Sequence, residues 1–160
     1  MLIREPNFRD NRKQGILFRY NIVNKEPSLI LNDTNENYRI FSARYFNTKT
    51  EVTNHVNFNT DLQLSSGFGK IAGEMQYRKL FDNNRQINLR LFAGTFLYND
   101  NTSNAYDFGL DRPNDYLFEY NLFGRSETTG FYSQQFLLAE GGFKSKVTPS
   151  LVNQWMVTTN

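Results

Sequence analysis

An alternation of apolar and polar residues over positions 56–77 constrains the fold of this chain more than any other feature. Apolar residues and one threonine recur at every second position from Val56 to Leu64, and polar residues stand between them. Successive side chains of a strand point to opposite faces, so a period of two predicts a β-strand and not a helix. Ser66-Gly67 predicts a two-residue turn, after which a second strand returns to Tyr77.

The turn also predicts which residues of the two strands face each other. A slip by one residue would mix the apolar and polar faces, so the register is well specified. Each strand exceeds the roughly 5–6 residues usual in globular sheets and approaches the roughly 9–11 that a tilted strand needs to cross a bilayer. The predicted pairs are Leu64–Gly69, Leu62–Ile71, Thr60–Gly73, Phe58–Met75 and Val56–Tyr77 on the apolar face, and Gln63–Lys70, Asn59–Glu74, Asn57–Gln76 and His55–Arg78 on the polar face.

Further strands are predicted on both sides of this hairpin, at 15–25, 37–47, 86–99 and 154–158. Residues 1–14 are polar and are expected to form a leading segment outside the regular hairpins of 15–99. Residues 100–160 are rich in loops and carry the late strands. Within them, 116–123 alternates loosely and 133–140 fits either a strand or a short helix.

Two of these strands have less regular faces than the hairpin. In 37–47, Phe41 and Tyr45 share a face with Arg39, so the alternation leaves open which face points outward. In 86–99, one face is apolar throughout, whereas the other begins polar and turns aromatic with Phe92, Phe96 and Tyr98.

Composition excludes several classes of protein. The chain has no cysteine, which excludes disulfides and thiolate metal sites, and its 15 Phe and 9 Tyr are too many for a disordered chain. It has no apolar run of about 18 residues, which excludes a transmembrane helix. A net charge of +2 without a basic cluster predicts no nucleic-acid partner. A mean hydropathy of −0.61 still suits a membrane barrel, because half of its strand residues face a wet interior.

We therefore expect one all-β domain, or a fragment of one, over 1–160: an antiparallel up-and-down meander that forms part or all of a transmembrane-type β-barrel. The residues predicted to face its lumen are His55, Asn57, Asn59, Asp61, Gln63, Lys70, Glu74, Gln76, Arg78 and Arg90. The residues predicted to face lipid are Val56, Phe58, Leu62, Leu64, Ile71, Met75, Tyr77, Ile87, Leu89, Leu91 and Leu97.

Three groups of residues on these strands allow two interpretations each. The pairs Glu74–Arg90 and Lys70–Asp61 should approach on the inner face, as a charge network or as a substrate pathway. The small residues should meet across adjacent strands, where they either leave room for a loop or mark a bend. The tyrosines near strand ends form either an interfacial girdle or an ordinary β-strand enrichment. The small residues are Ala72, Gly73, Ala93 and Gly94, and the tyrosines are Tyr20, Tyr77 and Tyr98.

No catalytic motif emerges from the sequence. His55 is the single histidine, so the two histidines of a zincin site are missing. No glycine-rich phosphate loop, nucleophile elbow or spaced carboxylate pair is present. We predict no catalytic residue, no metal site and no cofactor.

Several later passages resemble a family of large outer-membrane proteins of the Bacteroidetes group. The resemblance rests on Phe108-Gly109-Leu110, Asn114-Asp115-Tyr116-Leu117-Phe118-Glu119-Tyr120, Phe123-Gly124-Arg125-Ser126-Glu127, Ser133-Gln134-Gln135, Glu140-Gly141-Gly142-Phe143-Lys144 and Asn153-Gln154-Trp155. In that family a gluzincin-type, aminopeptidase-like zinc domain precedes a long C-terminal region expected to be a β-barrel. The resemblance places all 160 residues in the C-terminal region, and no zinc ligand or general base has a counterpart here.

The expected function is structural: a segment of a barrel in the outer membrane of a Gram-negative bacterium that anchors a covalently linked upstream domain or forms a small pore. Membrane lipid is its expected partner. Residues 1–6 lack the apolar core of a signal peptide, so we expect either a mature chain or, as we favour, an internal piece. The alternative is a soluble β-barrel or sandwich that binds an apolar or glycan ligand. A weaker third interpretation is an enzymatic parent whose metallopeptidase site lies outside this chain.

Overall fold

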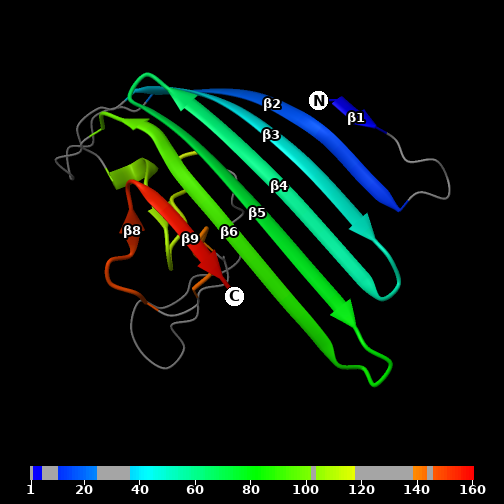
Figure 1. Ribbon diagram of the computed structural model, residues 1–160. Coiled ribbons are helices and arrows are strands. Elements are labelled where there is room, and N and C mark those ends of the chain that lie inside the picture. The colour runs from blue at the N-terminus through cyan, green and yellow to red at the C-terminus, as the bar shows by residue number, and fades with distance from the viewer. Residues whose placement is uncertain (1, 5–10, 25–36, 102–103, 118–138, 144–145) are drawn as a thin grey trace.

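The computed structural model describes residues 2–4, 11–24, 37–101, 104–117, 139–143 and 146–160 (Figure 1). Five long strands dominate it, and shorter elements lie at both ends of the chain. The elements are β1 (Leu2–Arg4), β2 (Arg12–Val23), β3 (Tyr38–Thr50), β4 (Asn54–Ser65), β5 (Phe68–Leu80), β6 (Gln86–Asn99), the short 3₁₀ helix η1 (Asn104–Tyr106), β7 (Phe108–Gly109), β8 (Leu151–Val152) and β9 (Trp155–Thr159).

Seven strands form one antiparallel sheet in the order β1-β2-β3-β4-β5-β6-β9, and β7 and β8 form a separate pair. The all-β antiparallel meander is thereby confirmed. Among the described residues the sheet is open, with β1 and β9 as its two edges. Closure into a barrel is therefore no part of the observed fold.

The register predicted for the central hairpin is confirmed at all its pairs, from Leu64 opposite Gly69 to His55 opposite Arg78. The strand predicted at 86–99 coincides with β6, and the one predicted at 154–158 is β9, one residue further on. Most of the segments 116–123 and 133–140, for which strands or a helix were expected, lie outside the described residues.

The expectation for residues 1–14 is wrong in part. Leu2–Arg4 pairs with β2 as an edge strand, and Arg12 to Gln14 already belong to β2. The reason is that β3 continues to Thr50 and so offers backbone partners opposite these residues. The side chains of Arg12 and Lys13 are exposed, so their polarity is compatible with a strand at this position.

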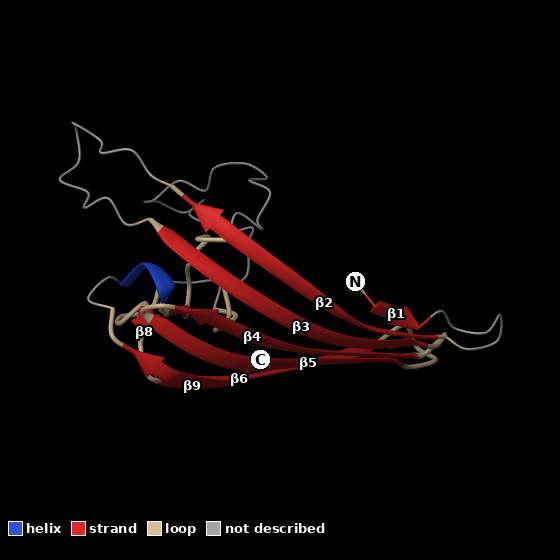
Figure 2. Ribbon diagram, turned by 90° about the horizontal axis from the view of Figure 1, so that it is seen from above, coloured by secondary structure: helices blue, strands red, loops and turns tan. Residues whose placement is uncertain are grey.

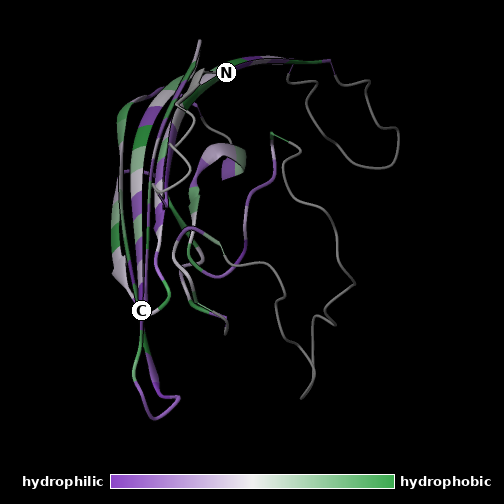
Figure 3. Cartoon of the chain, turned by 90° about the vertical axis from the view of Figure 1, so that its right-hand side faces the viewer, coloured by the Kyte–Doolittle hydropathy of each residue, from purple (hydrophilic) through white to green (hydrophobic). Residues whose placement is uncertain are grey.

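The sheet is strongly curved, and Figure 2 shows η1 and β8 on its concave side. We call the concave side the inner face and the convex side the outer face. Residues 104–117, 139–143 and 146–152, which lie against the inner face, are called the inner segment. Along the strands, hydrophobic and hydrophilic residues alternate (Figure 3), and successive side chains of a strand lie on opposite faces of the sheet.

The buried core lies between the inner face and the inner segment, at the end of the sheet that carries the Ser66–Gly67 turn. One cluster joins Tyr38, Ile40 and Phe68 of the sheet to Tyr106 and Tyr116 of the inner segment. A second cluster joins Phe92 and Met156 to Phe108. In the described part of the chain, no helix is long and apolar enough to cross a membrane.

Two face assignments come from the structure. Phe41, opposite Leu64, lies on the outer face, whereas Tyr38 and Ile40 are buried on the inner face, which answers the question left open for 37–47. Tyr98 lies on the outer face opposite Gly69, not on the inner face with Phe92 and Phe96 as expected. A register shift between Gly69 and Lys70 causes the difference, because it inserts an extra residue into β6.

Candidate functional site

The inner face gathers the charged residues of four adjacent strands around a cavity of about 270 Å³. Strands β3 to β6 each contribute side chains, and the inner segment forms the opposite wall. Six of the residues predicted to face inward line this cavity: Asn59, Asp61, Gln63, Lys70, Glu74 and Arg90. The other four, His55, Asn57, Gln76 and Arg78, lie on the same face nearer the opposite end of the sheet, in the predicted register.

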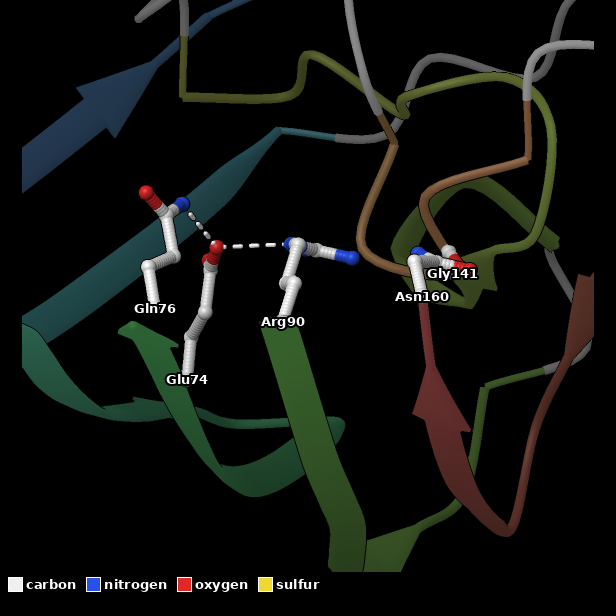
Figure 4. A network of polar contacts seen from close by, with 5 residues as sticks. All are labelled: Glu74, Gln76, Arg90, Gly141 and Asn160. Carbon is white, nitrogen blue, oxygen red and sulfur yellow. Dashed lines mark hydrogen bonds and ion pairs between the residues drawn. The ribbon is translucent and has the colours of Figure 1, made fainter. Parts of the chain in front are cut away.

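Two ion pairs on the inner face join residues that the structure describes. Arg44 of β3 donates from Nε to Asp61 Oδ1 at 2.5 Å, and Arg90 of β6 donates from Nε to Glu74 Oε1 at 2.7 Å. The second is the predicted pair, and Figure 4 shows it with Gln76, whose Nε2 donates to the same carboxylate oxygen. The side chain of Arg90 is only 14% exposed, so this pair is shielded from solvent.

Lys70 is the most deeply buried charge of the sheet, at 3% exposure. Its Nζ donates a hydrogen bond to the Tyr106 carbonyl oxygen at 3.0 Å and lies 4.8 Å from the ring centroids of both Phe108 and Tyr116. Lys70 and Asp61 both line the cavity, while Asp61 carries the ion pair with Arg44.

The inner segment is held by polar contacts that sequence patterns did not reveal. Glu140 Oε2 accepts the Gly109 amide at 3.0 Å, and Asp111 Oδ2 accepts the Val147 amide at 3.2 Å. Tyr116 donates to Gln63 Oε1 at 2.5 Å. Burial raises the pKa of Asp107, and the nearby Lys70 ammonium acts against that rise.

The small residues Ala72, Gly73, Ala93 and Gly94 do meet across β5 and β6, as Ala72–Gly94 and Gly73–Ala93 pairs. At Gly94 the inner segment explains the missing side chain, because a Cβ there would lie 2.8 Å from Phe108 Cζ. Of the two interpretations, room for a loop therefore holds at the inner-face position.

The residues predicted to face lipid lie together on the outer face, and six of them are more than one-third exposed: Phe58, Ile71, Ile87, Leu89, Leu91 and Leu97. The remaining five, Val56, Leu62, Leu64, Met75 and Tyr77, are partly exposed on the same face.

His55 lies far from the charged cavity. Its Nδ1 is 3.1 Å from Thr50 Oγ1, and it faces Arg78 across the hairpin. Among the residues that the structure describes, no group of three or more His, Asp or Glu is placed to hold a metal ion. The paired charges form the predicted network in Arg44–Asp61 and Arg90–Glu74, while the buried Nη1 of Arg90 has no hydrogen-bond partner within the described ranges.

Comparison with known proteins gives no match to a family model, a curated protein or a solved structure.

Proposed function

We propose that this chain is a segment of an outer-membrane β-barrel wall, with its outer face against lipid. The observation that carries the proposal is the exposure of apolar side chains on one continuous face. Eleven of them, on β2, β3, β4, β5, β6 and β9, are between 37% and 67% exposed: Ile16, Phe18, Tyr20, Ile22, Phe41, Phe58, Ile71, Leu89, Leu91, Trp155 and Val157.

Exposure on this scale is unfavourable in water. Each square ångström of apolar surface removed from water contributes roughly 25 cal/mol, and monomeric soluble proteins rarely expose continuous apolar patches of more than a few hundred Å². Acyl chains would cover this face without any further protein. The five long strands contain 12, 13, 12, 13 and 14 residues, enough for a tilted crossing.

The polar residues of the inner face also support the proposal. Barrel walls alternate lipid-facing apolar residues with interior polar residues along each strand. Here Arg44, Glu74 and Arg90 occupy the interior positions and pair with each other or with Asp61. Tyr20 and Tyr98, on the outer face near strand ends, would lie at the depth of an aromatic girdle.

The resemblance to Bacteroidetes outer-membrane proteins adds a role to this location. In that proposal the chain is the membrane portion of a longer protein and anchors an upstream metallopeptidase-like domain. No catalytic role falls on its own residues. The proposed partners are membrane lipid and the covalently linked domain.

The test is to refold the whole chain with and without lipid. We expect a β-type circular dichroism spectrum and a blue-shifted Trp155 emission in phosphatidylcholine vesicles, and aggregation in buffer alone. Trp155 is suited to this measurement because it is the single tryptophan and is 66% exposed on the outer face. A soluble monomer that unfolds cooperatively in buffer would contradict the proposal and favour a soluble ligand-binding sheet.

A further inference from the structure

The inner segment forms a compact unit although it comes from two separate stretches of the chain. β7 and β8 pair antiparallel, with Phe108 opposite Val152. The Gly141 amide donates to the Gly109 carbonyl at 2.8 Å, and the Leu110 amide donates to the Ser150 carbonyl at 2.8 Å. These bonds join the two stretches through their backbones, so the inner segment can pack as one body against the sheet.

Aromatic rings join this unit to the inner face. Tyr106 stacks on Phe68 with ring centroids 4.6 Å apart and meets Tyr38 edge to face at 5.6 Å. Phe108 meets Phe96 at 5.1 Å, also edge to face. Such contacts bury large apolar areas and fix ring orientation.

The sheet is shaped to receive these rings. Gly94 lacks the Cβ that would collide with Phe108, and Ala72 beside it packs against the same cluster. Larger residues at these two positions would hold the inner segment away from the wall.

Lys70 adds a polar link between the wall and the inner segment. Its ammonium donates to the Tyr106 carbonyl and lies over the rings of Phe108 and Tyr116. The carboxylates of Glu140, from the inner segment, and of Asp61, from the wall, line the same cavity as Lys70. A buried charge of this kind is stable only while these partners stay in place.

We infer that the inner segment is an internal plug, held by Lys70, and that this wall therefore anchors without conducting. The inference rests on the proposed function and decides between its two roles, anchor and pore. Release of the plug would leave the Lys70 ammonium without its carbonyl acceptor and expose the rings of Tyr106 and Phe108 to the interior.

Cysteine labelling tests whether the plug is seated, because the chain has no cysteine of its own. Ser42 lies on the inner face of β3, opposite Gln63, at 9% exposure, and a cysteine there is nearly isosteric with serine. Thr48 lies on the same strand and face, beyond the cavity, and serves as the matched control. We expect the Ser42→Cys variant to react with a polar maleimide at least about tenfold more slowly than the Thr48→Cys variant.

In the second step, Lys70→Met is combined with Ser42→Cys; methionine keeps an unbranched apolar side chain and removes the ammonium donors. Lys70→Met should raise the labelling rate of Ser42→Cys toward that of Thr48→Cys. Lys79→Met, a substitution of an exposed lysine on the same strand, should leave the labelling rate unchanged. Ala139→Cys, buried at 1% in the inner segment, repeats the measurement from the other side. In planar bilayers the unmodified chain should give no channel events, and Lys70→Met should give them.

Equal labelling of Ser42→Cys and Thr48→Cys, or steady conductance by the unmodified chain, would overturn the plug. Protection that persists in Lys70→Met would overturn the role of Lys70. Failure of the chain to enter vesicles contradicts the proposed function instead, and the labelling contrast, measured in detergent or buffer, still decides whether the plug is seated.

Discussion

The outer and inner faces of the sheet follow opposite rules, although the same strands build both. On the outer face, phenylalanine, leucine and isoleucine side chains from adjacent strands lie exposed. On the inner face, Lys70, Arg90 and Glu74 are largely buried, and the chain places its own inner segment over them. A water-soluble sheet would normally use its covering elements on the apolar face.

This contrast is informative because covering segments lower the free energy most where they remove apolar surface from water. Here the inner segment covers the aromatic end of the inner face and the charges beside it, whereas the apolar rows of the outer face stay open. That arrangement is stable where something other than this chain covers the outer face. Each of the following variants changes one face and compares it with a matched position.

The largest effect is expected on the inner face, from Arg90→Met. Glu74 would lose its ion-pair partner at 2.7 Å while staying three-quarters buried. Breaking a buried pair costs about 3–5 kcal/mol, and the residual exposure favours the lower value. Urea unfolding in micelles measures the loss, with Arg78→Met, exposed on the same face, as the control. A double-mutant cycle with Glu74→Gln should show strong coupling, and additive losses would contradict the network.

On the outer face, the Leu91→Arg variant tests whether this face contacts lipid or water. Arginine near the middle of a lipid-facing strand costs about 2–4 kcal/mol, whereas an exposed position in water tolerates it within about 0.5 kcal/mol. Folding yield in vesicles checks this, with Asn88→Arg on the inner face of the same strand as the control. Equal yields for both variants would mean that the outer face does not meet lipid.

The central hairpin was predictable because two independent signals agreed. The alternation from Val56 to Leu64 set the faces, and the short Ser66–Gly67 turn set the register, so every predicted pair was confirmed. Where these signals were weaker, so was the prediction. β3 carries Arg39 on the same face as Phe41, and only the buried neighbours of Tyr38 and Ile40 settle its orientation.

The inner segment could not be predicted in the same way. Its strands β7 and β8 have two residues each and come from positions about forty residues apart, so no period in the sequence reveals them. Tyr98 was misassigned because a bulge inserts one residue and reverses the alternation. The one usable signal for a packed loop is the small Ala72–Gly94 pair, which on its own fits a bend equally well.

A moderate effect is expected where the wall meets the inner segment, from Gly94→Val. Its side chain would enter the space of the Phe108 ring, which lies 2.8 Å from the position of a Cβ. Overpacking of this kind costs about 1–3 kcal/mol. Gly73→Val, whose Cβ would have no neighbour closer than 3.8 Å, is the control. Denaturant midpoints measure both, and a loss in Gly73→Val alone would contradict the packing described for the inner face.

The smallest effect concerns the outer face, from Tyr98→Phe. The Tyr98 hydroxyl donates to the Ser65 carbonyl at 2.6 Å and so fastens the bulged end of β6 to the neighbouring turn. A net hydrogen bond contributes about 0.5–1.5 kcal/mol in water. At an interface with lipid, fewer water molecules would be available to replace the lost hydrogen bond to the Ser65 carbonyl. We therefore expect the loss in vesicles to exceed the loss in detergent, whereas Tyr20→Phe, at 58% exposure on β2, should change neither. Identical losses in the two media would place this end of the sheet in water.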